Sequence, residues 1–422
     1  MITRLVAPLA LAAGCCAASS AAQETLVRAL LADGSWMKAK VVSVSPGEWR
    51  VAQEGDGQER TIPDTEVLAF IMERSRSSGR DTAVAGDQQA AQEAPSPISF
   101  GLLEFANGQK LPGTFRAARD ANYWDHRWIG SIPIDLAQLA TLRFRGARTP
   151  DRRTDGDSIL LLNGDLLTGF VEKLGADIEF EPLAADDGAD TKPARRTIAN
   201  DRVAAISLAR TEVAPSGSPR IWSFDGSVVD GASLRFDAKL GWGFELADPL
   251  MAKIRSSRTS DNSAANPIAA LLSPSRVVPL ADAGKPTATV PPEHYQFGID
   301  RAVRVAPVDR ALLGLASIEL AGPVIASFPV PAAVGAALEP AIFTCEVALA
   351  EPAPRDARVD IEFRSAGGAP VRVTLDGQNR RRPVSFTSGK GSLEIAVTDG
   401  GNGIAGDAIV LERACFILSP RK

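Results

Sequence analysis

Short runs of alternating apolar and polar residues recur along the chain, and a two-residue turn signal separates them in pairs. The signal is an Asp or Asn residue followed by glycine. It is the strongest local indicator of a β-hairpin, because both central residues of a type I′ turn need a positive φ. In the last three copies a second glycine follows five positions after the first. The four turns are Asp33-Gly34, Asn107-Gly108, Asn163-Gly164 and Asp225-Gly226.

The repeated turns predict a tandem array of small β-modules. In each module a strand leads through the turn into a second strand. A third strand carrying an aromatic residue follows, and a short tail ends in an apolar strand, which in the fourth module we place at Val277 to Leu280. The module resembles a five-stranded, Sm-like or SH3-like small barrel. We expect barrels at 23–72, 97–146, 157–210 and 218–284, a disordered linker at 73–96 and a polar insertion at 256–266.

From about Tyr295 the strands become longer, and four of them alternate with period two. Clean alternation is typical of half-buried strands, and four at close spacing predict a β-sandwich over 295–422. No stretch of the chain after the first 22 residues has helical periodicity, so the predicted fold class is all-β. The four strands are Phe343 to Leu349, Val359 to Phe363, Val371 to Leu375 and Leu393 to Val397.

The order of features in this region resembles the NPCBM family of carbohydrate-binding modules. These are galactose-binding-like jelly rolls attached to glycoside hydrolases, including the family 98 type, and to exported proteins. The most specific piece is the D-G-G-N-G-x-x-G-D stretch at Asp399 to Asp407, and the match covers roughly Ile318 to Leu418. Two features depart from the pattern: no histidine occurs in Gly322 to Ser327, and Ala408-Ile409 stands where His and Trp are usual.

The resemblance implies a glycan ligand, held by loop residues of the jelly roll. The candidate contacts in these loops are Asp376, Asp399, Asn402 and Asp407. The oxygen donors of the last three suit a hard cation such as Ca²⁺. The alternative is that Asx and glycine residues simply form tight turns without a metal.

A dense aromatic cluster at Tyr123 to Trp128 is the second candidate site. On an extended strand Trp124, His126 and Trp128 share one face, which suits stacking on a sugar ring or a peptide. Trp128 takes the place of the aromatic residue in the third strand of the other modules, so we assign it to the core. Trp124 is therefore the candidate ligand contact, with a core position as the alternative.

The reactive side chains do not assemble into a recognisable active site. The two histidines, His126 and His294, lie in different modules, and no phosphate-binding glycine loop occurs. A net charge of −5 argues against a nucleic-acid partner. We therefore predict no catalysis and, apart from the Ca²⁺ alternative, no cofactor. A polysaccharide hydrolase with two converging carboxylates is the enzyme alternative.

The N-terminus has the pattern of an export signal over 1–22. Arg4 supplies the positive charge, Leu5 to Gly14 the apolar segment, and Ser20 to Ala22 the cleavage site. The apolar segment is shorter than the roughly 20 residues that span a bilayer, and no later segment predicts a transmembrane helix. The expected location is periplasmic or extracellular, with lipid attachment at Cys15 as the alternative to a soluble form.

Removal of this signal leaves two cysteines, Cys345 and Cys415. An even pair in an exported protein is compatible with one disulfide, and two buried free thiols are the alternative. Together the patterns predict an exported, non-catalytic binding or scaffold protein. Its barrels act as spacers or protein-contact surfaces, and its C-terminal module contacts glycans or envelope components. The remaining alternative is a purely structural envelope protein that makes protein–protein contacts.

Overall fold

The computed structural model confirms the all-β class. It describes residues 25–55, 57–73, 101–118, 121–144, 148–183, 194–209, 217–237, 241–247, 267–290, 302–306, 311–331, 338–401 and 408–420. The regular elements in these ranges are strands and short 3-10 helices. The predicted export signal, the 256–266 insertion and most of the linker lie outside the described residues. Within the described part, no helix is long and apolar enough to cross a bilayer.

The first barrel has the predicted five strands. The first strand pairs antiparallel with both the second and the fifth, and a 3-10 helix returns the chain from the fourth strand to the fifth. Trp49 on the third strand is 2% exposed and packs edge-on against Phe70. The elements are β1 (Leu26–Leu31), β2 (Trp36–Ser45), β3 (Glu48–Gln53), β4 (Glu59–Pro63), η1 (Asp64–Glu66) and β5 (Val67–Met72).

The second and third barrels repeat this order. In each, the Asx-Gly turn joins the first two strands, and the fifth strand returns to pair with the first. The second comprises β6 (Gly101–Phe105), β7 (Lys110–Ala117), β8 (Asn122–His126), β9 (Gly130–Pro133), η3 (Leu136–Gln138) and β10 (Leu139–Arg143). The third comprises β11 (Asp157–Leu161), β12 (Leu166–Lys173), β13 (Asp177–Pro182), β14 (Arg196–Ala199), η4 (Asn200–Arg202) and β15 (Val203–Ser207).

The fourth barrel closes earlier in the sequence than the pattern predicted. Its last strand is β19 (Pro267–Leu271), where Ala270 pairs with Ile221 of the first strand. The segment that we expected to close it, β20 (Val277–Pro279), pairs instead with the last strand of the chain. Both segments are short and apolar, so only the pairing distinguishes them. The other strands are β16 (Arg220–Ser223), β17 (Val228–Asp237) and β18 (Gly241–Leu246).

The barrels join in two pairs through their closing strands. β5 of the first pairs antiparallel with β19 of the fourth, and β10 of the second pairs with β15 of the third. Equivalent residues lie opposite each other at both centres, Phe70 with Ala270 and Leu142 with Ile206. Each pair therefore has a local two-fold axis.

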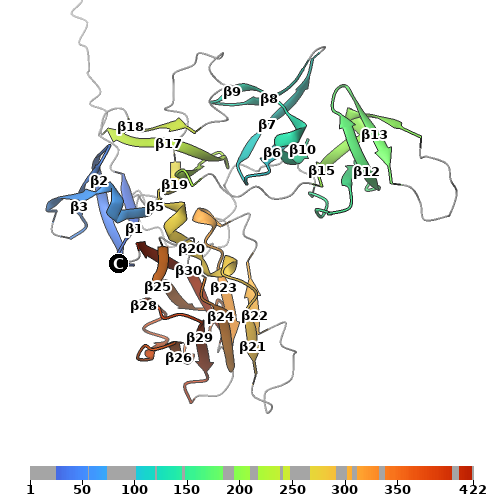
Figure 1. Ribbon diagram of the computed structural model, residues 1–422. Helices are drawn as coiled ribbons and strands as arrows, with labels where there is room; N and C mark the ends of the chain where they lie inside the picture. The colour runs from blue at the N-terminus through green and yellow to red at the C-terminus, as the bar shows by residue number, and fades with distance from the viewer. Residues whose placement is uncertain are drawn as a thin grey trace, which may run out of the picture.

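The two pairs meet where the second barrel touches the fourth. Lys110 of β7 pairs with Val228 of β17, and each residue lies three positions after its own Asx. The order of the barrels in space is therefore third, second, fourth, first. Figure 1 shows the green third barrel at one end of this row and the first barrel close to the C-terminal domain.

The C-terminal domain is the predicted β-sandwich. Its core holds Phe328, Phe343, Phe363 and Phe416, each at most 1% exposed. One sheet has the order β22 (Val303–Val305), β23 (Ile318–Ala321), β30 (Ala408–Pro420), β25 (Leu338–Leu349), β28 (Arg381–Thr387), with β20 also on β30. The other has the order β21 (Thr287–Thr289), β24 (Val324–Pro329), β29 (Ser392–Thr398), β26 (Arg358–Ser365), β27 (Val371–Asp376).

The Asx-Gly turn of the first barrel is packed against the sandwich. The Thr344 hydroxyl donates to the Gly34 carbonyl over 2.9 Å. Gly34 has a φ of +83°, and a Cβ at this position would lie 2.6 Å from both Ile342 Cγ2 and Ser385 Oγ. Only glycine satisfies both the turn and the close approach.

Cys345 and Cys415 are free thiols, so the disulfide alternative is wrong for this structure. Their strands, β25 and β30, are neighbours, but the two side chains lie on opposite faces of the sheet. Cys345 packs in the sandwich core, whereas Cys415 packs with Leu30 between the sandwich and the first barrel. Burial raises the pKa of the Cys345 thiol above its usual range and that of Cys415 to about 12.

Candidate functional site

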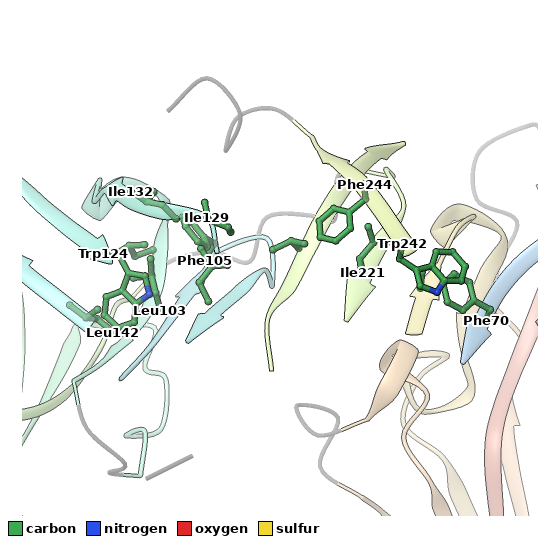
Figure 2. Close-up of a cluster of buried hydrophobic side chains, with 14 of the residues drawn as sticks. Phe70, Leu103, Phe105, Trp124, Ile129, Ile132, Leu142, Ile221, Trp242 and Phe244 are labelled. Carbon is green, nitrogen blue, oxygen red and sulfur yellow. The ribbon is translucent and has the colours of Figure 1, made fainter. Parts of the chain in front are cut away.

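Trp124, the predicted aromatic ligand contact, lies in the core of the second barrel with none of its surface exposed. Figure 2 shows its ring among Leu103, Ile132 and Leu142. Gly113 on the neighbouring strand makes room for it, because a Cβ there would lie 2.5 Å from Trp124 Nε1. Trp124, rather than Trp128, thus takes the core place of the aromatic residue on the third strand.

Trp128 lies instead at the joint between the second and fourth barrels. Its Nε1 donates to Asp225 Oδ2 over 2.8 Å, directly beside the turn of the fourth barrel. Its ring makes edge-to-face contacts with His126 and with Phe244 of β18, at centroid distances of 4.8 and 5.6 Å. The aromatic cluster therefore joins two barrels and leaves no stacking face for a ligand at Trp124.

His126, Asp225 and Ser227 come together at this joint, although sequence reasoning assembled no such group. His126 Nε2 lies 2.9 Å from Ser227 Oγ and 3.4 Å from Asp225 Oδ2. The backbone N–H of Ile129 donates to Nδ1 over 3.2 Å, so the neutral ring carries its proton on Nε2. In a catalytic triad the carboxylate and the hydroxyl engage different ring nitrogens, whereas here both face Nε2. The arrangement stabilises the joint and does not activate the serine.

The electrostatics of the joint favour an ionised Asp225. Burial alone raises the pKa of this carboxyl, but hydrogen bonds from His126 and from the backbone and side chain of Ser227 outweigh it. The result is a pKa of about 2. Asp225 therefore holds the joint as a carboxylate at neutral pH.

The polar candidates of the sandwich lie together at one end of its second sheet. β26 begins at Arg358, which lies opposite Asp376 at the end of β27. On the other side of β26, Asp360 pairs with Thr398 at the end of β29, and Asp399 follows. The same register places Gly400, the residue after Asp399, beside Arg358, and a Cβ on Gly400 would lie 2.8 Å from Arg358 Cγ. We call Arg358, Asp376 and Asp399 the loop-end cluster.

Each carboxylate of the loop-end cluster also stabilises its own turn. Asp376 Oδ1 accepts from the backbone N–H groups of Asn379 (2.7 Å) and Gln378 (2.9 Å). These bonds lower the pKa of Asp376, and the positive charge of Arg358 acts in the same direction. Asp399 Oδ1 accepts from the Gly401 N–H over 3.1 Å. Both residues adopt the Asx turn that was the alternative to a ligand role.

Of the three residues of the calcium hypothesis, the structure describes only Asp399. Asn402 and Asp407 lie outside the described residues, so their distance from Asp399 is not defined. Among the residues that the structure describes, no three His, Cys, Asp or Glu side chains are grouped as metal ligands. The predicted Ca²⁺ at Asp399, Asn402 and Asp407 stays a prediction.

Sequence reasoning missed Arg358 as a member of the loop-end cluster. Its signal was positional: it opens the strand Val359 to Phe363, which alternates clearly, but its partner across the sheet depends on the register. A further ion pair at this end joins Arg380 to Glu351 over 2.8 Å. The described residues of the loops after β25, β27 and β29 therefore present an exposed surface of mixed charge.

A separate cleft of about 370 Å³ lies between the first and fourth barrels. Trp49 and Leu234 line it together with Pro219, and Asp64 is the carboxylate in this lining. Asp64 Oδ2 already accepts from the Gly47 N–H over 3.0 Å. Glycoside hydrolysis ordinarily requires two carboxylates, so the described lining of this cleft does not provide that chemistry.

Comparison with known proteins gives matches at the level of structure alone. No protein-family model matches the chain, and no curated protein matches it. A CBM51 module from a Clostridium perfringens family 95 glycoside hydrolase, in complex with methyl-galactose, is 17% identical. Its match covers 33% of this chain and 99% of the module, with a TM-score of 0.25.

Two further similar structures also contain modules of this class. CBM51-2 with the INT domains of Clostridium perfringens ZmpB, in complex with GlcNAc, is 15% identical with a TM-score of 0.26. That match covers 34% of this chain and 31% of the solved ZmpB chain. Tandem CBM51 modules of a Streptococcus pneumoniae family 98 glycoside hydrolase are 11% identical, with a TM-score of 0.25. That match covers 62% of this chain and 87% of the tandem modules. These three structures each contain a CBM51 module.

Proposed function

We propose that the chain is an exported, non-catalytic binding protein whose C-terminal sandwich contacts a glycan through the loop-end cluster. The observation that carries this proposal is the exposed Arg358, which lies directly opposite Asp376 at the sheet end where Asp399 begins the neighbouring loop. The barrels form a row that ends beside the sandwich and act as a scaffold for it.

The chemistry of the cluster suits a polyhydroxylated ligand. A carboxylate accepts hydrogen bonds from hydroxyl groups, and a guanidinium donates several in a fixed fork. Placed side by side, the two groups match the donors and acceptors of neighbouring sugar hydroxyls. The described residues of this end, 350–358, 376–381 and 398–401, contain no aromatic side chain, so the contact proposed is polar rather than a stacking platform.

A purely structural role is the second candidate. The observation that favours it is that Asp376 and Asp399 each accept hydrogen bonds within their own turns. In that case the carboxylates shape the loops, and the barrels and sandwich serve only to hold other envelope proteins.

A glycan array probed with the full chain separates the two candidates. The array includes galactose- and N-acetylglucosamine-containing glycans, which are the sugars in the similar structures. Selective binding is expected. Asp376→Asn should weaken it, because the amide oxygen keeps the turn while the charge is removed. An array without signal from folded protein would contradict glycan binding and favour the structural role.

Calcium and export are tested separately. Repeating the array with a chelator shows whether Asp399, Asn402 and Asp407 act through Ca²⁺, since a metal site predicts loss of signal. The mass of the mature protein from its source tests export, because cleavage before Gln23 and lipid attachment at Cys15 give different products. An uncleaved chain would contradict the export part of the proposal.

A further inference from the structure

Every barrel carries the same short surface at its Asx-Gly turn. We call it the turn face and define it as five residues, from the one before the Asx to the third after it. In chain order the four turn faces are Ala32–Trp36, Ala106–Lys110, Leu162–Leu166 and Phe224–Val228.

The turn faces of the second and fourth barrels contact each other through their last residues. Lys110 and Val228 occupy the last position of each face and pair across the contact. The residues before them, Gln109 and Ser227, are 2% and 0% exposed. Gln109 Oε1 accepts from the backbone N–H of Asp230 over 2.9 Å. Because equivalent positions meet, this contact has a local two-fold axis.

The first barrel uses its turn face to dock on the sandwich. Gly34 accepts a hydrogen bond from Thr344. Trp36, at the last position of the face, packs with the cluster between barrel and sandwich, and the Arg413 guanidinium lies 5.3 Å from its ring centre. Three of the four turn faces therefore make contacts within the chain, although Phe224, the first residue of the fourth barrel's face, is 54% exposed.

The turn face of the third barrel is exposed along its whole length. Leu162 is 48% exposed and Leu166 is 54% exposed, and nearby Phe170 on β12 is 49% exposed. A Cβ on Gly164 would meet no atom within 4 Å. These three account for half of the six large exposed hydrophobic residues in the described part of the chain. Such a cluster marks an interaction surface, unlike isolated exposed side chains.

We propose that the turn face of the third barrel docks on the same face of a second copy of this chain. The contact between the second and fourth barrels supports this partner, because it joins two turn faces through a two-fold axis. A surface of that kind is self-complementary, as a two-fold homodimer requires. The position also fits: the sandwich packs against the first barrel at one end of the row, and the third barrel forms the other end (Figure 1).

The contact between the second and fourth barrels predicts which residues lie at the two-fold axis of the dimer. Leu166 lies at the position of Lys110 and Val228, so the two copies of Leu166 meet. Asp165 lies at the position of the buried Gln109 and Ser227, so the two Asp165 carboxylates come close together. Apolar contact therefore favours the dimer, and like charge opposes it. The two residues give opposite predictions.

Sedimentation equilibrium of the full chain tests the dimer, over concentrations up to about 100 µM, which populate a dimer with a Kd in the micromolar range. Wild-type protein should dimerise. Leu166→Asp should weaken the dimer by at least about 100-fold, since it places two further charges at the axis. Asp165→Asn should strengthen it, and added salt should do so as well. Val305→Asp, at an exposed apolar residue of the sandwich, is the matched control and should have no effect.

A cysteine variant tests the geometry independently. The two residues of an antiparallel pair are close enough for a disulfide, so Leu166→Cys should form a covalent dimer on oxidation. Val305→Cys should not, and Cys345 and Cys415 are buried; the test uses protein that begins at Gln23, which excludes Cys15 and Cys16. A monomer at every concentration would overturn the proposal and leave the face to a different protein. A dimer that is insensitive to Leu166→Asp and not captured by Leu166→Cys would also overturn it. Circular dichroism confirms that each variant is folded.

Discussion

Trp124 of the second barrel and Asp376 and Asp399 of the sandwich were all predicted from sequence as ligand contacts, and their surroundings differ. Trp124 is buried in the core, and His126 and Trp128 join two barrels. Arg358, by contrast, is exposed at the end of a sheet, directly opposite Asp376. In a small barrel the largest aromatic rings are needed for the core and the joints. Side chains available for a ligand lie where loops end a sheet, away from those contacts.

Of the changes considered, removal of the Trp124 side chain should have the largest effect on stability. Because the ring is fully buried, Trp124→Ala should lower the free energy of unfolding by about 3–5 kcal/mol. Denaturant unfolding followed by circular dichroism measures the loss. Trp128→Phe is the control, since it removes one hydrogen bond to Asp225 and keeps a ring. A loss below about 1 kcal/mol for Trp124→Ala would show that the ring is not a core residue.

Two glycines at equivalent turns separate docking from turn strain. Gly34→Ala and Gly164→Ala both place a side chain at positive φ, +83° and +92°, which costs about 1–2 kcal/mol. Only Gly34→Ala also meets neighbours at 2.6 Å, and overpacking adds about 1–3 kcal/mol. Unfolding at low protein concentration should show this difference. Equal losses in the two variants would contradict the docking of the first barrel on the sandwich.

Acid should weaken the joint between the second and fourth barrels. The folded pKa of Asp225 is about 2, below the value of about 3.9 for an unfolded aspartate. Its contribution to stability is therefore complete above about pH 4 and is lost as the pH falls towards 2. Asp225→Asn should be less stable than wild type by about 1 kcal/mol at pH 6, because a charge-assisted bond is lost. Near pH 2 the two proteins should converge, and a constant difference would contradict the lowered pKa.

The turns and the alternating strands could be predicted from sequence because they depend on neighbouring residues. Asp33-Gly34 and its three equivalents fix the hairpins, and the alternation from Phe343 onward fixes the sandwich strands. The sequence spacing contains a signal for Trp124 as the core residue: it lies 17 residues after Asn107, as Phe180 lies 17 after Asn163, whereas Trp128 lies 21 after Asn107. The pairing of β20 with the sandwich could not be predicted, because a short apolar strand can pair with more than one neighbouring strand.

The candidate site was predictable only in part for a related reason. Asp376 and Asp399 could be recognised in the sequence because each is followed by glycine. This pattern occurs both in tight turns and in ligand-binding loops. Arg358 could be assigned to the site only from the strand register, which places it opposite Asp376. The order of the barrels likewise follows from strand pairs such as Phe70 with Ala270, which connect distant segments.

The smallest effect on stability belongs to Arg358, and it accompanies the most direct test of the account. Arg358 is exposed, so Arg358→Ala should change the free energy of unfolding by no more than about 0.5 kcal/mol. Arg372→Ala, on the neighbouring strand β27 and paired with Glu362 over 3.0 Å, is the matched control. The measurement is the affinity of the full chain and both variants for a glycan identified on the array. The account predicts that Arg358→Ala loses binding at unchanged stability while Arg372→Ala retains it. Equal affinity in all three proteins would contradict the assignment of the loop-end cluster as the glycan site.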